Sequence, residues 1–167
     1  MTLGIIFFLI AYSVGASVPV DKQQTDDLRR HFAEQIKGID QNGIFINNIK
    51  IALGMFVPAV GIGLGMISGF YTGMIFTAIA QTSTLNHVPP LIILITPFGI
   101  MEVFAYGIAI SRSGIFIYQL IKKKPWREYA IPALVEIGLV LLILLVGALI
   151  EWQIITQFSG PHPLPNV

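Results

Sequence analysis

The chain has 167 residues, of which 54% are hydrophobic and 11% are charged, and its formal net charge is +1. Soluble globular domains carry about 25% charged residues, so this composition predicts an all-α fold, a polytopic membrane helix bundle. The small net charge, with no basic stripe among aromatic residues, argues against nucleic-acid binding. The absence of cysteine excludes disulfides and thiolate chemistry. No Ser/Gly/Pro linker divides the chain, so residues 1–167 are expected to form a single membrane domain.

The first predicted span is the uncharged run at residues 3–20. Its length is near the lower limit for a helix that crosses about 30 Å of hydrocarbon. The small residues Gly15 and Ala16 also resemble a signal-peptidase site, so a cleaved signal peptide is the alternative. No Lys or Arg precedes the apolar run, which favours a retained transmembrane helix.

A polar segment, residues 21–43, follows this span. Its apolar residues recur at every fourth position, at Leu28, Phe32 and Ile36. This spacing predicts an amphipathic helix with a narrow apolar stripe, beginning near Thr25 and ending near Gly38. We expect the helix to lie on the membrane surface or at the outer mouth of the bundle, and a solvated connector is the alternative.

Residues 44–80 form an apolar run whose single charge is Lys50. The run is too long for one crossing at about 1.5 Å per residue, and Pro58 removes a backbone donor within it. We therefore predict two spans, at about 44–60 and about 61–81. A different division of this run leaves four spans in the whole chain instead of five.

Glycine recurs at every fourth position in the second of these spans. The four positions are Gly61, Gly65, Gly69 and Gly73. On a helix they form one groove of small residues, against which another helix can pack at close range. The sequence leaves open whether that helix belongs to the same chain or to a partner.

A broken segment is predicted before the fourth span. A polar turn that includes His87 is followed by an apolar stretch too short to cross a membrane before Pro97. We expect a half-helix or re-entrant segment at 89–97, which requires protein to bury its backbone. The last two spans are predicted at about 98–121 and about 130–155.

The orientation follows from the basic residues at 122–127. The positive-inside rule places this short loop in the cytoplasm. Five spans then put the N-terminus in the cytoplasm and place both the 21–43 segment and the C-terminus outside. The proline-rich tail, residues 160–167, is expected to be irregular.

Charged residues occur inside the apolar spans. An ionised side chain at the centre of a membrane helix costs about 2.5–3.5 kcal/mol on insertion scales, so such residues need partners. Antiparallel helices bring residues of matched depth together, which predicts an ion pair between Arg112 and Glu136.

A second group of polar residues is expected to form one layer near the outer mouth, with Lys50 bridging to a carboxylate. Its members are Asn47, Asn48, Lys50, Glu102 and Glu151. Three roles remain open for these side chains: fastening helices together, relaying protons or ions, and contacting partner subunits.

No catalytic, cofactor-binding or metal-binding site is predicted. The three histidines, at positions 31, 87 and 162, lie far apart in the sequence and lack the spacing of a metal site. The sequence has no motif for a catalytic nucleophile with its general base and no phosphate-binding loop. We therefore predict that the chain is not an enzyme.

Two stretches carry a family likeness: residues 45–65, FINNIKIALGMFVPAVGIGLG, followed by Gly73, and residues 97–114, PFGIMEVFAYGIAISRSG. Glu151 also looks like a family position. These features resemble the stage II sporulation protein M family of integral membrane proteins. Family members commonly have histidine where this chain has Phe98, and asparagine where it has Thr72.

In endospore formers, the resemblance implies a membrane scaffold that holds a peptidoglycan-degrading complex. The two departures favour a structural or assembly role. We therefore predict a non-catalytic, multi-span subunit that docks other membrane proteins through its glycine groove and outer polar segment. Examples are an accessory subunit of a membrane-bound monooxygenase or respiratory enzyme, or of a cell-envelope complex. The alternative is a small transporter or channel in which the broken segment lines a path and Glu102 binds a cation or proton.

Overall fold

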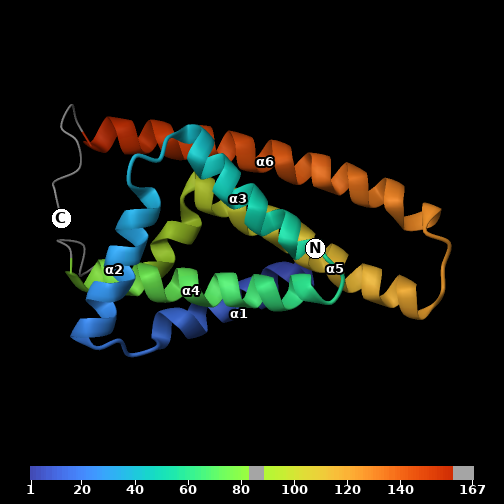
Figure 1. The fold of residues 1–167 in the computed structure, drawn as a ribbon, viewed down its shortest axis with the longest axis horizontal. Coiled ribbons are helices and arrows are strands. Elements are labelled where there is room, and N and C mark those ends of the chain that lie inside the picture. Colours follow the sequence, from blue (N-terminus) through green and yellow to red (C-terminus); the bar gives the residue numbers. More distant parts are fainter. Residues whose placement is uncertain (83–88, 160–167) are drawn as a thin grey trace.

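The computed structural model describes residues 1–82 and 89–159. Within these ranges the chain forms helices and no strand (Figure 1). The helices are α1 (Thr2–Ser17), α2 (Lys22–Ile36), α3 (Gln41–Met55), α4 (Val60–Thr82), the 3-10 helix η1 (Pro90–Ile95), α5 (Pro97–Ile121) and α6 (Arg127–Ser159). The predicted all-α bundle is confirmed. The predicted turn around His87 and the tail with His162 lie outside the described residues.

Three helices are long and apolar enough to cross a membrane, at Val60–Gln81, Pro97–Ile121 and Arg127–Gln157, whereas Thr2–Ser17 is apolar but shorter. Helix α3 has 15 residues, which corresponds to about 22 Å and is short of a bilayer core of about 30 Å. The count of about five spans is therefore not confirmed. Helices α1, α4 and α6 nevertheless run in one direction, and α3 and α5 run in the other (Figure 1).

The polar segment, residues 21–43, contains α2 and the start of α3, whereas one helix was predicted in it. Asp21 begins α2: its carboxylate accepts from the backbone N–H of Gln24, whose side chain accepts from the N–H of Asp21. Thr25 is not at the helix start but is buried, and its hydroxyl donates to the Gln81 side chain of α4 at 3.5 Å. Gly38 lies just after the helix with a positive φ of 69°. Asp40 then caps α3, which therefore begins before residue 44.

The apolar run at 44–80 breaks where proline predicts it. Helix α3 ends at Met55 and α4 begins at Val60, with Pro58 between them. Ala59 has a φ of 67°, a left-handed conformation that reverses the chain direction within this short turn. The predicted boundary at residue 60 is thus several residues too late for the end of α3.

The glycines of α4 face other helices of the same chain. A Cβ atom at Gly69 or Gly73 would lie within 3 Å of the carbonyl oxygen of Phe8 or Tyr12, respectively, in α1. A Cβ at Gly61 would meet the backbone of Met55 in α3 and the side chain of Ser113 in α5, and a Cβ at Gly65 would meet Ile110 of α5. The groove is therefore occupied within the chain, and the prediction that it docks other proteins is wrong.

Helix α6 occupies a separate position in the bundle. Among the described residues it packs against α5 and α3, whereas α1 packs against α4, α5 and η1. The largest apolar side chains that are almost fully buried come from α1, α3, α5 and α6: Tyr12, Met55, Ile110, Val140 and Leu144. Much of α6 is thus left on the outside of the bundle.

A short 3-10 helix, η1, is present within the predicted half-helix at 89–97. The Tyr12 hydroxyl of α1 donates to the carbonyl of Pro90 at 2.6 Å. Thr96 ends η1 by donating to the carbonyl of Ile93, and begins α5 by accepting from the N–H of Gly99. These bonds provide partners for a backbone that breaks within an apolar region.

Candidate functional site

An ion pair joins α5 to α6. Arg112 is 7% exposed, and its Nε donates to Glu136 Oε2 at 2.6 Å while its Nη2 donates to Glu136 Oε1. The guanidinium also lies 5.9 Å from the centre of the Phe116 ring. A bidentate arginine–carboxylate pair restricts the rotation of both helices. The contact predicted from matched depth is present in the structure.

A second polar contact joins α3 to α5. The amide of Asn48 donates to Glu102 Oε1 at 2.5 Å. Glu151 of α6 lies close enough to interact electrostatically with Glu102, and Tyr106 interacts with both carboxylates. We call Asn48, Glu102, Tyr106 and Glu151 the acidic cluster. It connects three helices that are distant in sequence.

Two residues expected in this layer lie elsewhere. Asn47 and Lys50 are exposed, and the salt bridges found among the described residues are Arg112–Glu136 and Lys124–Glu128. Each helical residue turns the chain by about 100°, so Lys50 points about 200° away from Asn48. The predicted bridge from Lys50 to a carboxylate is therefore wrong.

Sequence reasoning missed Tyr106. Its ring is 4% exposed and packs at 5.5 Å from the Phe8 ring of α1. Tyr106 follows Glu102 by four residues, the spacing that places two side chains on one face of a helix. That spacing was the available signal.

Chemically, the acidic cluster offers two carboxylates, a carboxamide and a phenol. Protonation of one carboxylate would reduce the electrostatic repulsion between the two. Within the described residues there is no group of three or more His, Cys, Asp or Glu side chains that fits a metal ion.

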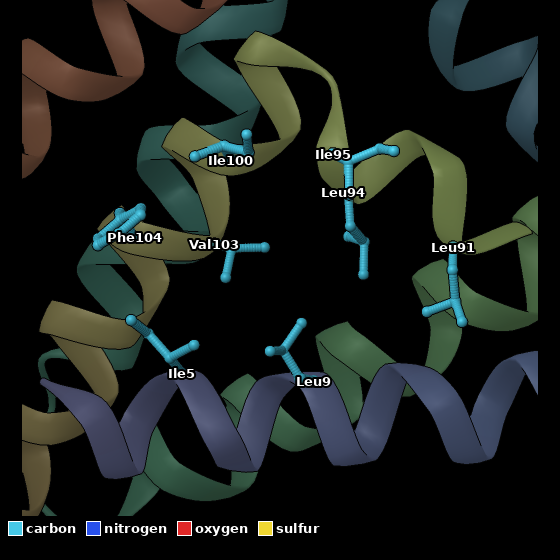
Figure 2. Close-up of a pocket in the computed structure, with 8 residues that line it drawn as sticks. All are labelled: Ile5, Leu9, Leu91, Leu94, Ile95, Ile100, Val103 and Phe104. Atoms are coloured by element: carbon cyan, nitrogen blue, oxygen red, sulfur yellow. The ribbon is translucent and has the colours of Figure 1, made fainter.

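An apolar cleft of about 340 Å³ lies between α1, η1 and α5 (Figure 2). It is lined by Ile5, Leu9, Leu91, Leu94, Ile95, Ile100, Val103 and Phe104. Figure 2 shows Ile5 and Leu9 of α1 across the cleft from Val103 and Leu94. Side chains of this kind give no hydrogen bond to water or to an ion. The face of the broken segment that borders this cleft is therefore unsuited to an ion pathway.

Residues 3–154 match the stage II sporulation protein M family. The chain belongs to this family. No curated protein and no solved structure matches it. The family likeness rested partly on Asn48, Glu102 and Glu151. Asn48 bonds to Glu102, and Glu151 interacts electrostatically with Glu102. The motifs at 45–65 and 97–114 thus belong to one region of the fold.

Proposed function

We propose that this protein of the stage II sporulation protein M family is a non-catalytic scaffold, an accessory subunit of a membrane protein complex. One observation carries the proposal. The buried Arg112 is bonded across helices to Glu136, and Asn48 to Glu102. Polar groups that bond to each other between helices act as fasteners and fix a rigid shape. A rigid shape suits a subunit that positions other proteins.

The proposed docking surface is the apolar flank of α6. We define this flank by its exposed residues Ile131, Leu134, Val135 and Leu142, which are 58–68% exposed. Because other helices of the same chain fill the glycine groove, a partner helix would meet the bundle elsewhere. Among the described residues, α6 packs only against α3 and α5. The partners would be subunits of a membrane-bound monooxygenase, a respiratory enzyme or a cell-envelope complex. By the positive-inside rule, the N-terminus is cytoplasmic and the C-terminus external.

The test is extraction of native membranes in mild detergent, followed by native electrophoresis and mass spectrometry. The chain should migrate with other membrane proteins at fixed stoichiometry. Leu134→Trp on the α6 flank should release them, because a bulky ring there blocks close helix contact. Ile67→Trp is the matched control, since Ile67 is equally apolar and exposed on α4. Migration of the parent chain alone or as a homo-oligomer contradicts the scaffold role.

A second candidate function, a proton or cation carrier, is favoured by the proximity of Glu102 and Glu151. Two carboxylates that lie close together in an apolar bundle repel each other when both are ionised. Protonation of one of them, or a cation nearby, reduces that repulsion. Cycles of binding and release at this pair would support transport.

Replacing Glu102 with glutamine separates the two functions. Glutamine keeps an oxygen that can accept from Asn48 but cannot bind a proton at physiological pH. A scaffold keeps its complex and its partners' activity in this variant, whereas a carrier reconstituted in liposomes loses most of its flux. Glu128→Gln, at an exposed carboxylate outside the cluster, should change neither readout. Absence of flux in the parent chain would eliminate the carrier, and loss of assembly in Glu102→Gln would contradict the expectation for the scaffold.

A further inference from the structure

A cluster of lysine and arginine side chains lies at one end of the bundle. We call residues 122–127, which join α5 to α6 and include the first residue of α6, the basic loop. Its cations are Lys122, Lys123, Lys124 and Arg127, and all four are exposed. In Figure 1 the loop lies at the end opposite α2.

This positive charge has little compensation within the protein. Among the described residues, the one ion pair of the basic loop joins Lys124 Nζ to Glu128 Oε2 at 4.0 Å, with both side chains about half exposed. In α2, by contrast, acidic and basic residues alternate along the helix. The two ends of the bundle therefore differ in charge, and among the described residues the basic loop has one carboxylate partner for its four cations.

Aromatic rings place this charge at the level of lipid headgroups. Lys122 Nζ lies 5.9 Å from the centre of the Tyr118 ring, and Arg127 lies 5.8 Å from that of Trp126. Both rings are exposed. Tyr and Trp concentrate where a membrane meets water, and α5 and α6, which flank the loop, are both long and apolar enough to cross a membrane.

The backbone holds the cations in place. The N–H of Lys122 donates to the carbonyl of Tyr118, and the N–H of Lys124 donates to that of Gln119. Lys123 has a φ of 50°, which turns the chain back toward α6. These bonds keep the lysines at the C-terminal end of α5, where the helix dipole also favours cations.

We propose that the basic loop binds the headgroups of anionic phospholipids and thereby selects the lipids around α5 and α6. Charge complementarity carries the proposal, because a phosphodiester without a compensating cation matches the unpaired lysines. A zwitterionic headgroup brings its own ammonium group and gains less from the loop. Each cation near an anionic membrane surface should favour the anionic lipid about fivefold.

The chain contains two tryptophans, which provide a reporter and its control. In a Trp152→Phe variant, Trp126 within the basic loop is the only tryptophan, and Trp126→Phe leaves Trp152 near the other end of α6. The full chain is reconstituted in vesicles that contain either brominated phosphatidylglycerol or brominated phosphatidylcholine at equal mole fraction. Bromine quenches a tryptophan only at short range, so quenching measures the lipids beside each ring.

Brominated phosphatidylglycerol should quench Trp126 more strongly than brominated phosphatidylcholine. Substituting Lys122, Lys123 and Lys124 with glutamine should lower this preference at least fivefold, and salt at 0.5 M should weaken it because the loop is exposed. Neutralising Lys22, Arg30 and Lys37, three exposed cations of the polar segment, should leave the Trp126 preference unchanged.

Three results would overturn the proposal: equal quenching by both lipids in the parent, a preference retained after the lysine substitutions, or an equal preference at Trp152. The third result would show a general attraction to the bilayer instead of a site. Should the substituted chain fail to fold by gel filtration, the salt dependence in the parent decides, because a preference that persists at high salt excludes an exposed basic site.

Discussion

Arg112→Ala is expected to lower the free energy of unfolding of the bundle by about 3 kcal/mol. The change removes two hydrogen bonds to Glu136 and leaves this carboxylate in the bundle without a cation. The side chain of Glu136 is 31% exposed, but the surface at this depth of α6 borders hydrocarbon, so water does not screen the lost charge. Unfolding of detergent-solubilised protein, followed by circular dichroism, measures the change.

A double substitution tests whether the two residues act as a pair. Arg112→Ala with Glu136→Ala should recover part of the loss, because no unpaired charge remains. Lys124→Ala serves as the comparison, since its pair with Glu128 is exposed and such pairs contribute under about 1 kcal/mol. Strictly additive losses from the two single changes would mean that Arg112 and Glu136 do not interact in the folded protein.

Gly73→Ala is expected to cost about 3 kcal/mol, at the upper end of the range for overpacked sites. The added methyl group would lie against the carbonyl of Tyr12 and the N–H of Ala16 in α1. Backbone atoms cannot relieve the clash by changing rotamer as a side chain can, so α1 and α4 must move apart. Separation would also strain the bond from Thr77 Oγ1 to the carbonyl of Ala16. The same unfolding assay detects this loss.

Gly63→Ala is the matched control on the same helix. A Cβ atom at Gly63 meets nothing within 4 Å, and alanine favours a helix over glycine by about 1 kcal/mol. This variant should therefore be as stable as the parent or more so. Equal stability of the Gly63 and Gly73 variants would contradict the close approach of α1 to α4.

The helical membrane bundle could be predicted because the sequence patterns that indicate it lie within single helices or depend on how deep a residue lies in the membrane. A long apolar run identifies a membrane helix, and Pro58 marks a break in it. The Arg112–Glu136 contact followed from the depth of each residue in antiparallel helices. Depth does not specify the direction in which a side chain points around a helix. For this reason the predicted bridge from Lys50 to a carboxylate is wrong, although Asn48 does bond to Glu102.

Helix boundaries are harder to predict because several residues can serve as caps. Thr25 is a suitable N-cap residue, but the start of α2 is set by Asp21, which forms a reciprocal cap with Gln24. Asp40 likewise caps α3 before the apolar run begins. The partner of the glycine face depends on contacts between residues more than 50 positions apart, such as Tyr12 and Gly73, which the spacing within one helix does not reveal.

The close fit of α1 against α4 has a consequence for biogenesis. Helix α1 has 16 residues, about 24 Å in length, which is less than the hydrocarbon thickness of about 30 Å. During synthesis it leaves the ribosome well before α4, the helix against which it packs most extensively. The nascent α1 can therefore pack against α4 only after α4 has been made. The order of synthesis thus places the docking of α1 after the synthesis of α2 and α3.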